Sequence, residues 1–157
     1  MKIGIASDHR GFNLKEQLKG ELARRNFEVI DYGTNSDKST DYPDYAFILG
    51  ENVRDGKVNF GVAICGSGIG ISIACNKVKG VRCAKVVNKE EAIITRNDNN
   101  SNIVAFGENI PIDKALEIVI NFISTPFSDE EKHHRRVDKI TEYEGKIEWH
   151  LNLYYIL

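Results

Sequence analysis

One stretch of the chain, residues 59–76, combines a reactive side chain with a glycine-rich turn. An apolar run that begins at Phe60 ends at a thiol, Cys65, and the sequence Cys-Gly-Ser-Gly-Ile-Gly continues to Gly70; we call residues 65–70 the Cys65 turn. Glycines let a ligand approach backbone N–H groups, and the N–H groups that open a helix lack internal partners, so they suit an anion. A thiol beside such a turn indicates a catalytic centre, whereas the alternative is a plain strand-to-helix turn.

The side chains of this turn leave several interpretations open. Cys65 is a nucleophile, a general base or a buried core thiol, and the helix that follows it favours the thiolate. Ser67 is either the N-cap of that helix or a proton donor to a substrate. The other two cysteines, Cys75 and Cys83, lie in apolar segments without such neighbours, so we expect them to be packing residues.

The spacing of the glycines argues against a nucleotide site. Gly66-Ser-Gly-Ile-Gly70 is not the six-residue GxGxxG fingerprint of dinucleotide-binding proteins, and it follows the third predicted strand instead of the first. No lysine of the Walker type follows it either. The turn is short enough to surround a small oxyanion or an enediolate, which backbone donors would stabilise.

Two other groups of polar residues are candidates for binding. Asp8 and His9 follow the first predicted strand, and such a pair is either a loop hydrogen-bonding unit or part of a site. The run Lys-His-His-Arg-Arg at residues 132–136 is either a solvated basic face or a phosphate clamp, since arginine offers a planar fork of donors. The histidines at positions 9, 133, 134 and 150 show no HxxxH spacing, so no metal site is predicted.

Composition predicts one globular domain. The chain has 157 residues, 41% of them apolar and 28% charged, with a net charge of −2, so nothing favours a nucleic-acid or membrane partner. We find no apolar run long enough to span a bilayer and no signal-peptide pattern at the start. The 3 cysteines are odd in number and lack CxxC spacing, which predicts free thiols and a cytoplasmic protein.

The periodicity of the apolar residues predicts alternating strands and helices. Helices are expected where Leu14, Leu18 and Leu22 share one face, from Pro43 onward, and from Asn88, which resembles a helix cap. The predicted strands are at residues 2–7, 27–32, 60–64, 81–87 and 103–106. This alternation is typical of an α/β domain with a five-stranded parallel sheet and right-handed crossovers.

The polar segments of the chain fall where such a fold would build a site. Ligands of open α/β sheets bind beyond the carboxyl ends of the strands. Residues 7–11, 32–42, 65–70 and 96–102 are polar segments that follow strands or are expected to face that edge. We therefore expect Asp8, His9, Cys65, Ser67 and the asparagine-rich segment 96–102, interpreted as a loop, around one crevice.

Together these residues resemble ribose-5-phosphate isomerase B, a family that includes the galactose-6-phosphate isomerases. The likeness extends from residue 1 to about residue 143 in matching order and spacing. It rests on Ser7-Asp-His-Arg-Gly-Phe12, Asp31-Tyr-Gly-Thr34, Asp41-Tyr-Pro43, Cys65-Gly-Ser-Gly-Ile-Gly-Ile-Ser-Ile-Ala74 with Asn76-Lys77, and Ala105-Phe-Gly107.

The resemblance implies a fold and an assembly. It implies a Rossmann-like three-layer α/β/α sandwich with a five-stranded parallel sheet, forming one domain over residues 1–145. The last helix, at about 128–145, would contact a partner subunit in a homodimer or tetramer with shared active sites. Residues 146–157 form an apolar C-terminal extension; its segment Trp149–Leu157 goes beyond the shared pattern, and we expect this segment to pack on a partner subunit.

The resemblance also implies a reaction. This is the interconversion of an aldose phosphate and a ketose phosphate through a cis-enediolate, without metal or cofactor, as for ribose 5-phosphate in the pentose phosphate pathway. Cys65 would be the general base, and Ser67 would assist ring opening or move a proton at oxygen. The backbone of Gly66, Gly68, Ile69 and Gly70 would stabilise the enediolate. Asp8 and Asn99 would hold sugar hydroxyls, Tyr42 would line the pocket, and His9 would bind the phosphate together with Lys132 and Arg136 from the partner.

Three departures from the family pattern leave the sugar open. Asp98 stands where many members have a histidine that assists ring opening, so either Asp98 replaces it or the substrate enters already open. Glu108-Asn109 stands where an arginine often contacts the phosphate, so a carboxylate is expected to repel an anion there. Lys132 replaces an arginine and loses its fork of donors.

These departures keep other functions under consideration. Galactose 6-phosphate, allose 6-phosphate, or a tetrose or uronate relative are alternative substrates of the same reaction class. A non-catalytic paralogue that binds sugar phosphate is a further alternative, against which the intact Cys65, Asp8 and glycine turn count. A nucleotide-binding module is disfavoured, because the glycine fingerprint is absent.

Overall fold

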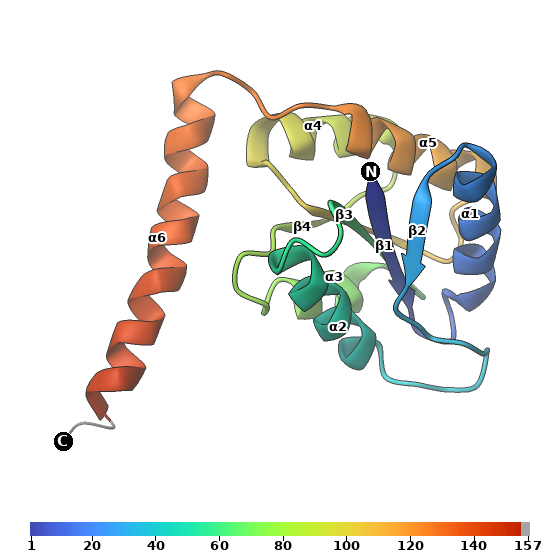
Figure 1. Ribbon diagram of the computed structural model, residues 1–157, viewed down its shortest axis with the longest axis horizontal. Helices are drawn as coiled ribbons and strands as arrows, with labels where there is room; N and C mark the ends of the chain where they lie inside the picture. Colours follow the sequence, from blue (N-terminus) through green and yellow to red (C-terminus); the bar gives the residue numbers. More distant parts are fainter. Residues whose placement is uncertain (155–157) are drawn as a thin grey trace.

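The computed structural model describes the backbone of residues 1–154 and the side chains of residues 1–146. Its sheet has five parallel strands in the spatial order β2-β1-β3-β5-β4 (Figure 1). The strands are β1 (Lys2–Ser7), β2 (Glu28–Asp31), β3 (Phe60–Cys65), β4 (Cys83–Lys85) and β5 (Ile103–Gly107). The predicted five-stranded parallel sheet is confirmed, and β4 is shorter than the predicted strand at 81–87.

Helices cover both faces of this sheet, so the molecule has three layers. Buried residues of α1, α4 and α5 pack on one face, and those of α2 and α3 pack on the other. The helices are α1 (Phe12–Arg24), α2 (Tyr42–Arg54), α3 (Ile69–Cys75), α4 (Lys89–Asn99), α5 (Ile112–Ser124) and α6 (Glu131–Tyr154). This is the Rossmann-like α/β/α sandwich that the sequence predicts.

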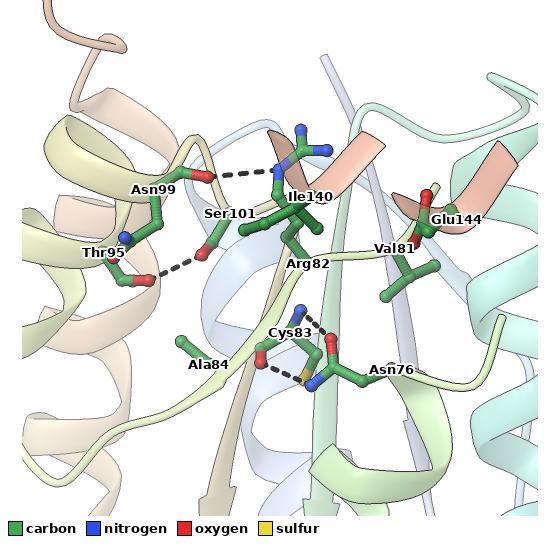
Figure 2. Close-up of a pocket in the computed structure, with 10 residues that line it drawn as sticks. All are labelled: Asn76, Val81, Arg82, Cys83, Ala84, Thr95, Asn99, Ser101, Ile140 and Glu144. Carbon is green, nitrogen blue, oxygen red and sulfur yellow. Dashed lines mark hydrogen bonds between the residues drawn. The ribbon is translucent and has the colours of Figure 1, made fainter. Parts of the chain in front are cut away.

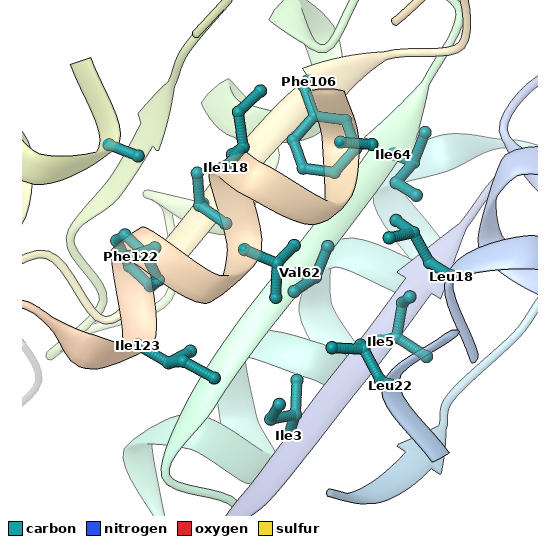
Figure 3. Packing of buried hydrophobic residues seen from close by; sticks show 14 of the residues in the cluster. Ile3, Ile5, Leu18, Leu22, Val62, Ile64, Phe106, Ile118, Phe122 and Ile123 are labelled. Atoms are coloured by element: carbon teal, nitrogen blue, oxygen red, sulfur yellow. The ribbon is translucent and has the colours of Figure 1, made fainter. Parts of the chain in front are cut away.

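The two faces of the sheet carry side chains of different size. Large residues such as Ile5, Val62 and Phe106 meet α1 and α5 (Figure 3), because alternate residues of a strand point to the same face. On the opposite face several of the buried strand residues are alanines, including Ala6 and Ala63. Small side chains let α2 and α3 lie close to the strands, so the start of α3 is held tightly against the sheet.

The segment predicted as a polar loop, residues 96–102, is mostly helix, and that prediction is wrong. Helix α4 continues through Asn99. Polar side chains near its end point into the molecule. The guanidinium of Arg96 is buried and lies 4.9 Å from the centre of the Phe60 ring. It donates to the Ser101 carbonyl at 2.7 Å. The Thr95 hydroxyl bonds to that of Ser101 at 2.6 Å. Because these partners are satisfied inside the fold, polar residues do not end the helix here.

The start of α4 follows the prediction. The Asn88 side chain accepts a hydrogen bond from the Glu91 amide at 2.9 Å, which is the predicted cap. The Glu91 carboxylate reaches back to accept from the Val87 amide at 2.8 Å. These bonds satisfy the N–H group of Val87, before the helix, and that of Glu91, in its first turn. Together they fix where α4 begins.

Helix α6 extends beside the body of the molecule at the side of β4 and α4 (Figure 1). His133 and Val137 are buried, and the Gly80 amide donates to the Glu144 carboxylate at 3.2 Å. The predicted boundary between residues 145 and 146 falls within this helix. The segment 146–157 lies almost wholly outside the described side chains, so its packing stays a prediction. No helix among the described residues is long and apolar enough to cross a membrane.

Candidate active site

The candidate site lies where the order of the strands changes direction. The chain leaves β1 outward to β2 and then returns across β1 to form β3, so β1 and β3 are neighbours, with Ser7 opposite Ile64. The segment after β1 leads to a helix on one face, and the segment after β3 leads to a helix on the other. A crevice at such a switch point is the usual ligand site of these folds. Asp8 and Cys65 lie at its two sides.

Backbone contacts fix the geometry of the Cys65 turn. Cys65 is 4% exposed, and its Sγ accepts a hydrogen bond from the Gly68 amide at 3.2 Å. The Ser67 Oγ accepts from the Ile69 amide at 3.1 Å, while Gly68 takes the N-cap position of α3. Gly68 has φ of 77°, and a Cβ atom there would lie 2.6 Å from the carbonyl carbon of Phe106. Only glycine fits that position, and Ser67 keeps its hydroxyl proton free to donate.

Three amide groups of the turn remain available. The N–H groups of Gly68 and Ile69 are used inside the turn. Among the hydrogen bonds of the described residues, none uses the N–H groups of Gly66, Ser67 or Gly70. These donors follow a strand whose last side chain is the thiol. Such an arrangement can stabilise negative charge that develops on a small oxygen-bearing substrate.

The loop after β1 presents Asp8 and His9 to the same crevice. Asp8 is buried, and its Oδ1 accepts from the Arg10 and Gly11 amides at 2.9 and 3.1 Å. The His9 Nδ1 accepts from the Thr40 amide at 3.2 Å. An imidazole that accepts at Nδ1 carries its proton on Nε2, so His9 offers an N–H donor from that atom.

Asp31 holds the loop that orients His9. Its Oδ1 accepts from the Gly33 amide at 2.9 Å, and its Oδ2 accepts from Lys15 and Lys19 at 2.5 and 2.6 Å. Burial alone would raise the pKa of Asp31, but the hydrogen bonds from the two lysines and the amide outweigh burial and lower it. Lys15 is completely buried, so this pair is an internal anchor for the loop that ends at Thr40.

Tyr42 closes one side of the crevice. It is the first residue of α2, and its side chain is partly exposed. A Cβ atom on Gly70 would come within 2.7 Å of the Tyr42 ring, so the ring lies directly against the Cys65 turn. The structure therefore brings together most of the predicted site: Asp8, His9, Tyr42, Cys65, Gly66, Ser67, Gly68, Ile69 and Gly70.

Arg10 and Glu108 form an ion pair at the edge of this site, which changes the expected role of Glu108. Arg10 Nε donates to Glu108 Oε1 at 2.8 Å, and Arg10 Nη2 contacts the same oxygen. That hydrogen bond and the charge of Glu108 raise the pKa of Arg10. The Glu108 carboxylate is thus matched by a cation, and its expected repulsion of an anion stays a prediction. Sequence patterns missed this pair, since 98 positions separate its members.

The other predicted site residues lie elsewhere in the chain. Asp98 and Asn99 end α4, which leads into the amino end of β5, whereas Cys65 ends β3 beside Gly107 at the carboxyl end of β5. The length of a five-residue strand, roughly 16 Å, separates these edges. The expectation that residues 96–102 surround the same crevice within one chain is therefore wrong.

These residues instead form a second polar group near the start of α6. Asp98 Oδ1 lies 3.7 Å from Nε2 of the buried His133, and Lys132 pairs with Glu130 at 2.7 Å. Arg136 is exposed, and the described residues include no ion-pair partner for it. We call this group the α4–α6 cluster; its members are Asp98, Asn99, Lys132, His133 and Arg136.

The largest described pocket, of about 430 Å³, lies between β4, α4 and α6 and not at the Cys65 turn (Figure 2). Asn76 donates to the Cys83 carbonyl and accepts from its amide, both at 2.8 Å, so this motif residue ties α3 to β4. Arg82 donates to the Asn99 carbonyl at 3.1 Å, and burial lowers its pKa. A hydrogen bond with Cys75, together with burial, raises the pKa of the Cys83 thiol. The raised pKa disfavours a thiolate in this larger pocket. We therefore assign the reactive centre to the Cys65 turn, which lies beside a smaller pocket of about 320 Å³.

The remaining cysteines and the acidic residues show no further reactive grouping. Cys75 is buried and Cys83 is half-buried, which confirms their prediction as packing residues, and all three cysteines are free thiols. Within the described part of the chain, no three His, Cys, Asp or Glu side chains converge as metal ligands would.

Comparison with known proteins adds independent findings. The protein-family model described as Ribose/Galactose Isomerase matches residues 3–140. The chain is 43% identical over 148 residues to the putative sugar phosphate isomerase YwlF of Bacillus subtilis, covering 93% of this chain and 99% of that protein.

Solved structures match equally well. The fold is similar to ribose-5-phosphate isomerase B of Clostridium thermocellum, with a TM-score of 0.90 and 45% identity over 94% of this chain and 99% of that one. It is also similar to ribose-5-phosphate isomerase B of Mycoplasma genitalium with bound ribulose-5-phosphate. There the TM-score is 0.86, with 37% identity over 92% of this chain and 96% of that one.

Proposed function

Since the chain belongs to the Ribose/Galactose Isomerase family, we propose that it interconverts ribose 5-phosphate and ribulose 5-phosphate. It is an aldose–ketose isomerase of that family. The observation that carries the proposal is the Cys65 thiol beside unpaired amides at the switch point of the sheet. The bound ribulose-5-phosphate of the Mycoplasma genitalium relative supports this choice of sugar.

Cys65 is the general base in this proposal. Its sulfur takes the proton from C2 of the open-chain aldose, the C–H electron pair forms the C1–C2 double bond, and the carbonyl pair moves onto O1. The proton then returns to C1, the O2 proton is transferred to O1, and the O2–H electron pair forms the C2 carbonyl of the ketose. The Gly68 amide that donates to Sγ suits a sulfur that carries negative charge.

The turn stabilises the enediolate that forms between these steps. Gly66, Ser67 and Gly70 supply the unpaired amides, while those of Gly68 and Ile69 shape the turn from within. A donor of this kind contributes about 2.7–4 kcal/mol to transition-state stabilisation in enzymes where one has been removed. The Ser67 hydroxyl moves a proton between the substrate oxygens.

The rest of the crevice binds the sugar. Asp8 uses only Oδ1 for its hydrogen bonds in the described residues, which leaves Oδ2 to accept from sugar hydroxyls. Tyr42 lines the pocket beside Gly70. His9 donates from Nε2 to the phosphate, because the Thr40 amide occupies Nδ1.

A second copy of the chain completes the site in this proposal. The α4–α6 cluster lies at the other edge of the sheet, so its Asp98, Asn99, Lys132 and Arg136 reach Cys65 only from a partner subunit. Exposed apolar side chains on α2 and α3, including Phe47, Ile48 and Ile73, support a homodimer, alone or within a tetramer. Free thiols support the cytoplasm as the place of this assembly.

Two positions favour a second candidate substrate class. Asp98 and the Glu108-Asn109 turn stand where the family pattern has a histidine and an arginine, so the ring-opening and phosphate ends of the site differ. Galactose 6-phosphate and allose 6-phosphate are the alternatives that use the same enediolate chemistry.

A coupled assay on a panel of pentose and hexose phosphates tests the proposal. We expect the highest kcat/KM with ribose 5-phosphate and none with Cys65→Ala. Faster turnover of a hexose 6-phosphate would reassign the substrate. Absence of turnover on every sugar phosphate, by protein that binds phosphate, would contradict an isomerase and favour the non-catalytic paralogue.

A further inference from the structure

Arg10 crosses the entrance of the crevice from the loop after β1 to the loop after β5. Its Cβ and Cγ lie 3.8 Å, and its Cζ 3.9 Å, from the position that a Cβ atom on Gly66 would occupy. Its guanidinium reaches Glu108, which follows the last residue of β5. Arg10 thus runs along Gly66, the second residue of the Cys65 turn, and is the immediate neighbour of His9.

The ion pair leaves most of the guanidinium free for another anion. Arginine has about five N–H donors in a planar fork, and two of them, on Nε and Nη2, meet Glu108 Oε1. No other hydrogen bond of this side chain is found in residues 1–146, and the side chain is 60% exposed. Three donors, including both on Nη1, therefore have no partner, while Glu108 limits the movement of the group.

The charges around the entrance make a cation necessary for an anionic ligand. Asp8 and Glu108 place two carboxylates beside the crevice, and Lys85 is the cation among the residues that line the hollow on the other side of the turn. A phosphate group entering between these carboxylates would be repelled without a balancing charge at the same place. Asn109, the next residue of the loop, is neutral and directs its Oδ1 toward Gly107.

We propose that Arg10, held by Glu108 along Gly66, binds the phosphate group of the substrate together with His9. The inference rests on the proposed function and names a binding residue for it. Glu108 acts as a positioning residue that limits the movement of the guanidinium, and Arg10 in turn balances the negative charge of this carboxylate. The cation comes from the same subunit as Cys65, in addition to those of the α4–α6 cluster.

Titration with inorganic phosphate at constant ionic strength tests this without a turnover assay. Arg10→Ala should weaken phosphate binding on the order of tenfold, as expected for one charge-assisted hydrogen bond at a partly exposed site. Arg10→Lys should recover part of that loss, because it keeps the charge but not the fork. Arg54→Ala is the matched control, since Arg54 also pairs with a carboxylate, Asp55, but at the end of α2. It should change binding less than about twofold.

Glu108→Gln separates binding from a merely structural ion pair. If the pair only stabilised the two loops, Arg10→Ala and Glu108→Gln would weaken phosphate binding equally. We expect Glu108→Gln to weaken it less than about twofold, because the cation remains while a competing negative charge is removed. Equal losses, an Arg10→Ala titration within twofold of wild type, or no phosphate binding by the wild type would each overturn the inference.

Kinetics give a second measurement where a sugar phosphate is turned over. Arg10→Ala should raise KM by about the same factor as the phosphate Kd, with kcat changed less than about threefold, because the phosphate is remote from the bonds that change. A loss confined to kcat would contradict a binding role. If no sugar phosphate is turned over, the proposed function fails, and the phosphate titration still decides the role of Arg10.

Discussion

The Cys65 turn and the α4–α6 cluster are built in opposite ways. The turn is fixed by the sheet: the thiol is 4% exposed, and Gly68 touches the backbone of Phe106. In the α4–α6 cluster, Lys132 and Arg136 are exposed side chains on a helix that stands beside the body (Figure 1). In the proposed function, the groups that need fixed geometry thus lie in the core of one chain, and the charges proposed to bind the phosphate lie on an exposed helix surface.

This difference predicts how each region responds to substitution. Buried groups with fixed partners affect folding and chemistry together, because their removal leaves neighbours unpaired. Exposed ion pairs such as Lys132–Glu130 contribute little to stability, since solvent already satisfies both charges. Substitutions in the turn and its supports should therefore change stability, whereas those of the exposed Lys132 and Arg136 should change function alone.

The largest expected effect is recovery of activity when two inactive variants are mixed. Cys65→Ala removes the base, and the pair Lys132→Ala and Arg136→Ala removes the cations of the α4–α6 cluster. If the site is shared, mixed dimers contain one intact site. Random pairing then restores roughly a quarter of wild-type activity, because half of the dimers are mixed and one of their two sites is complete.

The control for this experiment is a mixture of Cys65→Ala with Cys65→Ser, which should remain inactive. Subunits must first be exchanged by co-expression or by mild denaturation and refolding. No recovery in verified mixed dimers would place both regions in the same subunit's site and contradict the division between them.

A smaller effect is expected at the anchor of the loop that orients His9. Asp31→Asn leaves the buried Lys15 with only Glu16, and we expect a loss of about 3 kcal/mol in the free energy of unfolding. Chemical denaturation measures it. Asp55→Asn, which breaks an exposed pair with Arg54, should have no measurable effect.

The pH dependence of that loss has a definite sign. The pKa of Asp31 is lowered in the folded state, so its contribution is complete above the unfolded pKa of about 4 and is lost as the pH falls through the folded pKa. The difference between wild type and Asp31→Asn should therefore be constant near neutral pH and shrink in acid. A difference that grows in acid would contradict this assignment.

The smallest of the three effects compares two glycines with similar backbones. Gly68 and Gly56 have φ of 77° and 70°, but a Cβ on Gly68 would meet Phe106 at 2.6 Å while Gly56 has nothing within 4 Å. Gly56→Ala should cost about 1 kcal/mol from its φ alone, and Gly68→Ala at least about 2 kcal/mol with loss of turnover. Equal unfolding free energies would show that contact with Phe106 does not fix the turn.

Much of the fold was predictable because its signals are local. Leu14, Leu18 and Leu22 are buried on one face of α1, and Asn88 caps α4 as its side chain indicates. The Cys65 turn was predictable for the same reason, since its glycines and its thiol are consecutive in the sequence. Short-range patterns report backbone geometry well, because each residue restricts its own turn or strand.

Long-range pairing was not predictable in the same way. The polar run that ends α4 suggested a loop, yet Arg96 is buried against Phe60 and donates to the carbonyl of Thr125, both far away in the sequence. Likewise Glu108 suggested repulsion of an anion until the fold placed Arg10 beside it. In both cases the charged side chain has a tertiary partner that the local sequence does not indicate, so the role inferred from the sequence was different.

The role of Cys65 is tested most directly by solvent-proton exchange at C2 of the substrate. We expect Cys65→Ala to abolish deuterium incorporation from solvent while it still binds inorganic phosphate with near wild-type affinity. Cys75→Ala, which alters a buried thiol outside the site, should keep exchange and turnover. Near-normal exchange in Cys65→Ala would show that another group moves the proton, and it would contradict the chemistry assigned to the Cys65 turn.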